Sequence, residues 1–539
     1  MHDFFGLYIL LLLVILFLVM LSQRLRVSYP IVLVLGGLAL SFVPGLPEIR
    51  IDPELIFLIF LPPLLYEAAW YTSWKEFWKW RRVIASFAFL IVLLTSSVIA
   101  LVSGSLVPGF TLALGFLLGG IISPPDAVSA TSILRHIRVP KRLVAIIEGE
   151  SLLNDASSLI VFRFALAAVE SGNFVFGEAV SSFFVVIIMG ILTGLAVALV
   201  FFAIYRWLPT TPNIDIMLSF IAPYVMYLVA ERLHFSGVLA VVSGGLFLSI
   251  RSNIILDYRS RFRGETVWAT VGFALNGLVF MLIGLELPFI VRQLGDVSLK
   301  QAIWYGVLIS VVLMVVRLLC TLGASVFTRV ISRVITTADS NPGWKGPLVF
   351  GWAGMRGVVS LAAALSIPLY LGNGEPFPQR NLILFITFMV ILITLVFQGL
   401  TLPLVVRWVN MKEPDYQLSD EEQDAIVRKK LSMTALRMLQ EQYAEQVKSN
   451  GQLQGLQLKL EHDVKRLAGQ PALPDGAAAA REDWAAFREV YSGIILEQRQ
   501  LLQELNKKEE LGEDIIRKYI GLLDLEEERM RLQADGQEH

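Results

Sequence analysis

The sequence has one cysteine, five histidines and few charged residues for its length. Asp, Glu, Lys and Arg make up 17% of its 539 residues, and the formal net charge is −1. A single cysteine excludes a disulfide framework and a thiolate metal site, and a net charge near zero gives no overall basic field for nucleic acid. The sequence also has no Walker loop and no GxGxxG motif. We therefore expect no ATP drive, no nucleotide cofactor and no enzymatic activity.

Long apolar segments dominate what remains. Hydrophobic residues make up 55% of the chain, and its mean hydropathy is +0.65. Repeated apolar runs of about 18 or more residues are typical of a polytopic membrane protein. About thirteen spans can be placed, near 5–22, 30–46, 54–71, 83–105, 110–134, 141–169, 178–205, 213–232, 236–251, 265–289, 301–330, 346–371 and 381–409. The sequence predicts an all-α membrane domain over residues 1–410.

Basic residues alternate between the loops that join these spans. The loops after odd-numbered spans carry most of the Lys and Arg, beginning with Arg24 and Arg26 after the first span. The positive-inside rule places these loops in the cytoplasm. We therefore expect a multi-pass membrane protein with its N-terminus outside and its C-terminus in the cytoplasm. The first apolar run lacks a basic n-region and a cleavage site, which favours a spanning helix over a signal peptide.

Two spans contain helix breaks at corresponding positions. The fifth has Pro124 and Pro125, which remove backbone donors at membrane depth, and the twelfth has Gly351, Gly354 and Gly357, which weaken a helix. The odd offset between these spans reverses their orientation, so spans 1–6 and 8–13 are predicted to be inverted repeats with two interrupted, crossing helices. Such paired interruptions are typical of transport sites. The alternative is that the glycines only permit close helix packing.

Oxygen-bearing side chains gather beside the first break. Asp126 follows the prolines, and the next span carries Ser151, Asn154 and Asp155. Ser151 and Asp155 are four residues apart, so they share one helix face and offer oxygens to a small cation. Carboxylates at membrane depth usually mark an ion or proton pathway, and desolvation favours a protonated carboxyl group. These residues predict a cation/proton antiporter in which Asp155 carries the cation or the proton. The alternative is a buried structural pair, Asn154 and Asp155.

Three further charged residues belong to this prediction. Glu67, on the third span, is a candidate third oxygen donor, and the alternative is a carboxylate at the cytoplasmic interface. Arg356 lies in the glycine-rich break, where an unpaired cation is unfavourable. Glu150 is the expected partner of Arg356, because Asp155 must stay free to exchange. A mobile or substrate-facing Arg356 is the other possibility.

The chain changes character after about residue 411. Ser419 and Glu422 form a capping-box pattern, and polar helical sequence follows. Residues 468–480 have the composition of a linker, and a second helical stretch covers about 484–532. We expect a helical cytoplasmic tail over 411–539. It either pairs with itself, a partner subunit or the membrane domain, or is a solvated appendage.

At these motifs the sequence resembles the bacterial sodium/proton antiporters of the monovalent cation:proton antiporter-1 family, relatives of the eukaryotic sodium/hydrogen exchangers. The resemblance covers about residues 5–410. It rests on Ser123-Pro124-Pro125-Asp126-Ala127, on Glu148-Gly149-Glu150-Ser151-Leu152-Leu153-Asn154-Asp155, on Gly354-Met355-Arg356-Gly357 and on Leu61-Pro62-Pro63 before Glu67.

The resemblance implies a homodimer of thirteen-helix subunits, each with a dimerisation part and a mobile core. It implies a sodium site at Asp155, completed by Asp126, Ser151 and Glu67, and a structural ion pair between Glu150 and Arg356. The pair Asn154-Asp155 resembles electroneutral exchangers. A departure is Pro125, where relatives have threonine, so a hydroxyl ligand is lost while a carbonyl remains.

The sequence thus predicts a dimeric secondary antiporter that exchanges sodium, and also lithium, for protons one for one in pH and sodium homeostasis. Its partners are the sodium ion, the proton, the lipid membrane and a second subunit, without cofactor or nucleic acid. A potassium/proton antiporter, a cation channel and a non-transporting membrane sensor are the alternatives. The lack of a filter-like loop disfavours the channel, and intact Asp126, Asn154 and Asp155 disfavour the sensor.

Overall fold

The computed structural model describes residues 2–43, 58–134, 137, 139–172, 176–294, 297–333, 343–411 and 420–468, with short segments between 493 and 530. The chain divides into two compact units, 1–412 and 413–539. Across the described ranges the regular structure is helical, and no strand is formed beyond one isolated bridge between Tyr370 and Pro376. The prediction of an all-α protein is confirmed.

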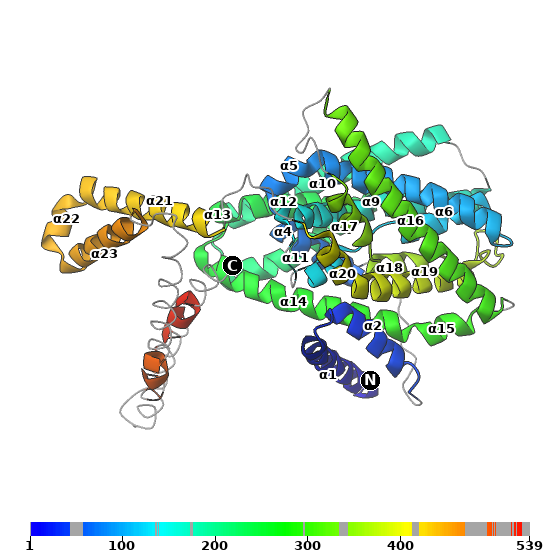
Figure 1. Ribbon diagram of the computed structural model, residues 1–539, viewed down its shortest axis with the longest axis horizontal. Coiled ribbons are helices and arrows are strands. Elements are labelled where there is room, and N and C mark those ends of the chain that lie inside the picture. The colour runs from blue at the N-terminus through cyan, green and yellow to red at the C-terminus, as the bar shows by residue number, and fades with distance from the viewer. Residues whose placement is uncertain are drawn as a thin grey trace. The chain divides into compact units, whose positions relative to one another are not determined.

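The first unit is a bundle of long apolar helices (Figure 1). Its N-terminal half contains α1 (His2–Leu25), α2 (Tyr29–Leu40), α4 (Leu61–Tyr71), α5 (Trp74–Ala85), η1 (Ser86–Ile91), α6 (Val92–Leu106), α7 (Leu112–Ile122), α8 (Ala127–Leu134) and α9 (Lys141–Ser171). Its C-terminal half contains α10 (Phe176–Trp207), α11 (Pro212–Arg232), α12 (Gly237–Ile250), α13 (Ser252–Ile255), α14 (Tyr258–Leu285), α15 (Leu287–Arg292), α16 (Leu299–Ile331), α17 (Lys345–Trp352), α18 (Val358–Leu365), α19 (Arg380–Ile393), η2 (Thr394–Gln398) and α20 (Gly399–Val409).

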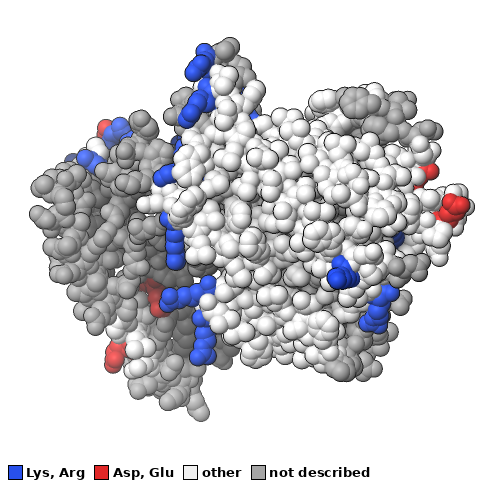
Figure 2. Space-filling model, turned by 45° about the vertical axis from the view of Figure 1, so that its right-hand side comes forward, with Lys and Arg blue, Asp and Glu red and all other residues white. Residues whose placement is uncertain are grey.

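These helices have the length and composition of membrane spans. Among the described residues, eight helical segments are long and apolar enough to cross a bilayer, and three shorter apolar helices accompany them. Within 181–207 on α10, 17% of an apolar 18-residue stretch is buried, whereas 72% of such a stretch is buried within 380–409, which runs from α19 to α20. Figure 2 shows a wide face without charged side chains, with Lys and Arg gathered near its margins. This is the surface expected of a lipid-facing protein. The count of thirteen and the inverted repeats stay predictions.

Small residues place α7 at the centre of the bundle. It packs between α6 and α9, and a Cβ on Gly119 would lie 2.7 Å from the carbonyl oxygen of Ser96. Glycine is therefore required where the backbones of α6 and α7 approach each other. This approach buries the last turn of α7, Gly119 to Ile122, immediately before the prolines. The first helix break is thereby held inside the protein.

The second unit is described over three helices. They are α21 (Asp420–Glu441), α22 (Ala444–Ser449) and α23 (Gly451–Ala468), and α21 packs against α23. The predicted helical character is present in this part of the tail. Ser419 of the expected capping box lies outside the described residues, as do most of the predicted linker at 468–480 and most of the second helical stretch.

Candidate functional site

Two helices of the first unit are interrupted, as the sequence predicts. Ser123 to Asp126 separate α7 from α8, and Ala353 to Gly357 separate α17 from α18. The two breaks lie against each other, because the backbone N–H of Asp126 donates to the carbonyl oxygen of Met355 at 2.7 Å. Irregular backbone is tolerated at membrane depth where protein groups satisfy its polar atoms. Each break thus supplies a partner to the other.

The carboxylate of Asp126 begins α8 and faces the second break. Its Oδ1 accepts the backbone N–H of Val128 at 3.1 Å, and its Oδ2 accepts the N–H and the hydroxyl of Ser129 at 3.1 and 2.5 Å. These bonds cap the helix start. A Cβ on Gly357 would lie 2.8 Å from Asp126 Oδ2, so the carboxylate touches the backbone of the second break directly.

One face of α9 packs against the first break. We call the two helix breaks and this face of α9 the crossing. Ser151 Oγ accepts the backbone N–H of Ala127 at 3.2 Å, and Asn154 Nδ2 donates to the carbonyl oxygen of Pro125 at 3.1 Å. Asn154 is fully buried, and its Oδ1 accepts no hydrogen bond from the described residues. The structure therefore brings Ser151, Asn154 and the first break together, and Asn154 holds the carbonyl oxygen of Pro125.

Among the described residues, Asp155 has no hydrogen-bond or ion-pair partner, unlike its neighbours Asp126, Ser151 and Asn154. Its side chain is 8% exposed and feels the like charge of Asp126. Within the described ranges its carboxylate accepts no hydrogen bond and forms no ion pair, whereas Asp126 is bonded to Ser129 and Val128. A buried carboxylate without partners favours binding of a proton or a cation that neutralises it. This arrangement suits reversible binding of either one.

The structure overturns the predicted ion pair between Glu150 and Arg356. Glu150 instead forms a two-pronged pair with Arg317 of α16, in which Nη1 donates to Oε1 at 3.0 Å and Nη2 donates to Oε2 at 2.8 Å. Both side chains are buried, at 1% and 3% exposure. Arg317 stands alone in an apolar span, and that isolation was the sequence signal for a functional or structural role.

Arg356 is fully buried and binds backbone carbonyls. Its Nε donates to the oxygen of Ile122 at 2.9 Å, its Nη2 donates to that of Ser123 at 3.2 Å, and its Nη1 donates to that of Gly354. The last carbonyls of a helix have no partners within it, and the break after α7 leaves such carbonyls inside the protein. The guanidinium satisfies them, which explains why Arg356 does not need Glu150.

Glu67 lies on α4, a helix outside the crossing. Its carboxylate packs against α14, where a Cβ on Gly272 would overlap it. Its role as a sodium ligand stays a prediction. Arg163, further along α9, pairs with Glu231 of α11 at 2.5 Å on a more exposed surface.

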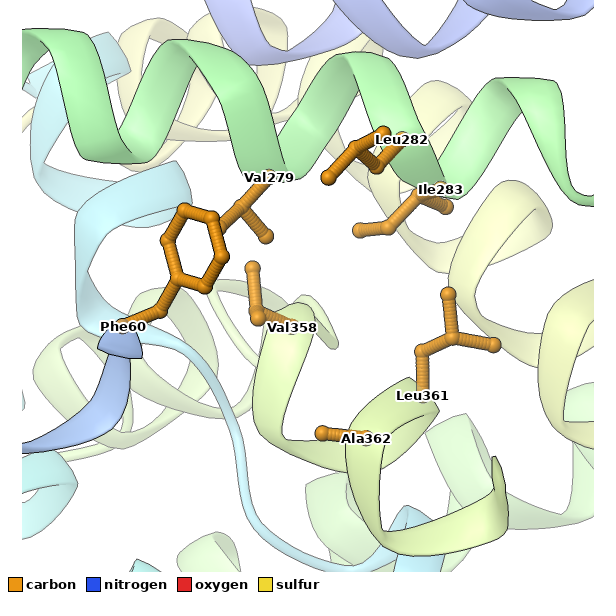
Figure 3. Close-up of a pocket in the computed structure, with 7 residues that line it drawn as sticks. All are labelled: Phe60, Val279, Leu282, Ile283, Val358, Leu361 and Ala362. Atoms are coloured by element: carbon orange, nitrogen blue, oxygen red, sulfur yellow. The ribbon is translucent and has the colours of Figure 1, made fainter. Parts of the chain in front are cut away.

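An apolar gap lies beside the second break. Figure 3 shows Phe60, before α4, and Val279, Leu282 and Ile283 of α14 facing α18, whose lining residues are Val358, Leu361 and Ala362. The space for water between them is about 10 Å³, room for no more than one molecule. A narrow gap with an apolar lining thus separates α14 from the helix that follows the break.

Two broken helices that lie against each other, beside a buried carboxylate with no partner among the described residues, are typical of a secondary ion transporter. The chain matches the family model described as "Sodium/hydrogen exchanger, transmembrane" over residues 9–408, and it belongs to that family. The resemblance read from the motifs is confirmed.

Relatives of this chain are named as exchangers or antiporters, and a solved structure shares its fold. An uncharacterised Na⁺/H⁺ exchanger of Mycobacterium tuberculosis (strain ATCC 25618 / H37Rv) is 31% identical over 525 residues, covering 96% of this chain and 94% of the relative. The sodium, potassium, lithium and rubidium/H⁺ antiporter of Bacillus pumilus is 33% identical over 423 residues, covering 76% of this chain and 61% of the relative. The structure of the sodium proton antiporter MjNhaP1 from Methanocaldococcus jannaschii at pH 8 covers 76% of this chain and 99% of its own, with a TM-score of 0.60 at 18% identity. That last likeness concerns the fold.

Proposed function

We propose that this protein exchanges sodium ions for protons at Asp155. The observation that carries the proposal is the state of that carboxylate, which is 8% exposed and has no hydrogen bond or ion pair within the described residues. A proton bound to Asp155 and a sodium ion bound beside it exclude each other, because both neutralise the same charge. Binding one releases the other, and this competition couples their movements.

The neighbouring oxygens suit a hard monovalent cation. Ser151 Oγ accepts one N–H bond, from Ala127, and a hydroxyl has a second acceptor lone pair. Asp126 makes three bonds through its two oxygens and has about four acceptor positions. Together with Asp155, these residues form the proposed sodium site, with Glu67 as the further ligand that the family resemblance implies. Lithium, with the same charge, is the second proposed substrate.

The charges buried at the crossing favour one proton for one cation. The buried residues Arg317 and Arg356 contribute two positive charges, and the buried Glu150 and Asp155 with the half-buried Asp126 contribute three negative ones. Without counting Glu67 on α4, one negative charge remains, and one proton or one sodium ion neutralises it equally. Since a net charge at this depth is costly, the loaded site is neutral in both states, and exchange is electroneutral.

Alternating access requires the crossing to move relative to α14. The apolar gap supports this step, because the apolar side chains of α14 and α18 that line it can separate and meet again without breaking hydrogen bonds. We propose a homodimer in the bacterial inner membrane, with an external N-terminus and a cytoplasmic tail over 411–539. Its proposed role is pH and sodium homeostasis.

Potassium is the second candidate substrate. The Bacillus pumilus relative is named as an antiporter of sodium, potassium, lithium and rubidium, and the chemistry of carboxylate and hydroxyl ligands is shared by all four ions. Any of these ions carries one positive charge and therefore neutralises the site as sodium does.

The test uses purified full-length protein in proteoliposomes with a pH dye inside. An imposed outward or inward gradient of sodium, lithium or potassium should drive opposite proton movement in a ranked order, with sodium first. The rate should not change when the membrane potential is clamped at different values. A rate that follows the potential would contradict one-for-one exchange, and potassium ranking first would select the second candidate.

A further inference from the structure

A separate cavity of about 290 Å³ lies between α4, α11, α13 and α14. None of its lining residues belongs to the helix breaks or to α9, so it is distinct from the proposed exchange site. The lining residues that matter here are two acids, Asp215 and Glu265, one base, Arg261, and the aromatic residues Trp70, Tyr71 and Trp268.

Asp215, which lines this cavity, is a buried carboxylate with an unpaired oxygen among the described residues. Its side chain is 6% exposed, and Oδ2 accepts the hydroxyl of Ser260 at 2.7 Å. Its Oδ1 accepts no hydrogen bond from any described residue. A buried acceptor that is left unpaired costs free energy, so a cation donor that reaches Oδ1 gains a charge-assisted hydrogen bond there.

The remaining lining groups favour a cation over an anion. The guanidinium of Arg261 is held by the carbonyl oxygen of Leu256, to which Nη1 donates at 2.5 Å. Against this one positive charge stand two carboxylates, Asp215 and Glu265, so the lining carries one net negative charge.

The size of the cavity selects an organic cation. A volume of about 290 Å³ far exceeds a bare alkali ion and lies at the lower end of the range for small-molecule sites, about 300–1,000 Å³. We propose that this cavity binds a small organic cation through an ammonium or guanidinium group held by Asp215. Either a soluble amine or the ammonium of a lipid headgroup supplies that chemistry.

The test is calorimetric titration of the full-length protein in lipid-free detergent with ethanolamine and with methylguanidine. Saturable binding is expected, and Asp215→Asn should weaken it about tenfold or more, because a charge-assisted hydrogen bond is lost. Gly264→Leu should weaken it without removing any hydrogen bond, since a Cβ there meets only Ile216 at 3.9 Å and the longer side chain fills the cavity. Glu170→Gln, an exposed charge change on α9, should leave it unchanged.

Two comparisons separate this site from the exchange site and the two sources from each other. Asp155→Asn should bind the probes as wild type does, and loss of binding in that variant would overturn the proposal. If the ammonium comes from lipid, wild type should have a higher thermal stability in nanodiscs of phosphatidylethanolamine than in nanodiscs of phosphatidylcholine. The thermal stability of Asp215→Asn should be the same in both lipids. Absence of both soluble and lipid binding, or equal binding by wild type and Asp215→Asn, would also overturn it.

Discussion

Replacing Arg317 by methionine should destabilise the membrane unit strongly while preserving side-chain volume. Glu150 and Arg317 are 1% and 3% exposed and are joined by hydrogen bonds of 3.0 and 2.8 Å. At 2.8 Å and an effective dielectric constant of about 20, the gross attraction is about 6 kcal/mol, most of which is offset by desolvation of both ions. The substitution leaves the carboxylate buried without this partner, which costs about 3–5 kcal/mol.

The matched experiment is a double-mutant cycle. Glu150→Gln with Arg317→Met removes both charges, so the double variant should be more stable than the sum of the single effects by about 2 kcal/mol. A second cycle pairs Glu150→Gln with Arg356→Met and should show a smaller coupling, because Arg356 binds carbonyl oxygens instead. Reversible chemical unfolding of the purified protein in detergent measures all variants. A larger coupling of Glu150 to Arg356 than to Arg317 would refute the reasoning.

Two further predictions concern the crossing. Gly357→Ala should abolish exchange in folded protein, because its Cβ would lie 2.8 Å from Asp126 Oδ2, whereas Gly372→Ala, with nothing within 4 Å, should transport as wild type does. Normal transport by Gly357→Ala would show that the carboxylate position is not critical. Asn154→Leu should cost about 1–3 kcal/mol of stability by leaving the carbonyl of Pro125 without a donor. Unfolding measurements that place this variant within experimental error of wild type would exclude that role.

The helix breaks could be predicted from sequence because their cause is local. Pro124 and Pro125 remove backbone donors wherever they stand, and glycines weaken the helix around Arg356. Both interruptions are present in the structure. The shared face of Ser151 and Asp155 followed from helical periodicity in the same way.

The partner of Glu150 could not be predicted, because it depends on how three helices are arranged. Arg317 and Arg356 give the same sequence signal, an arginine within an apolar span. The choice between them follows from the carbonyls that the break after α7 leaves free, which only the three-dimensional arrangement shows. Packing of α4 against α14, which directs Glu67 toward Gly272, is likewise a long-range property.

The central claim is that Asp155 carries the exchanged ion. The most direct measurement is sodium-induced dequenching of a pH dye in everted membrane vesicles, comparing wild type with Asp155→Asn at equal protein level. Asn keeps the shape of the side chain and removes its charge, so the proposal predicts dequenching by wild type and none by the variant. Equal dequenching by both proteins would contradict the account.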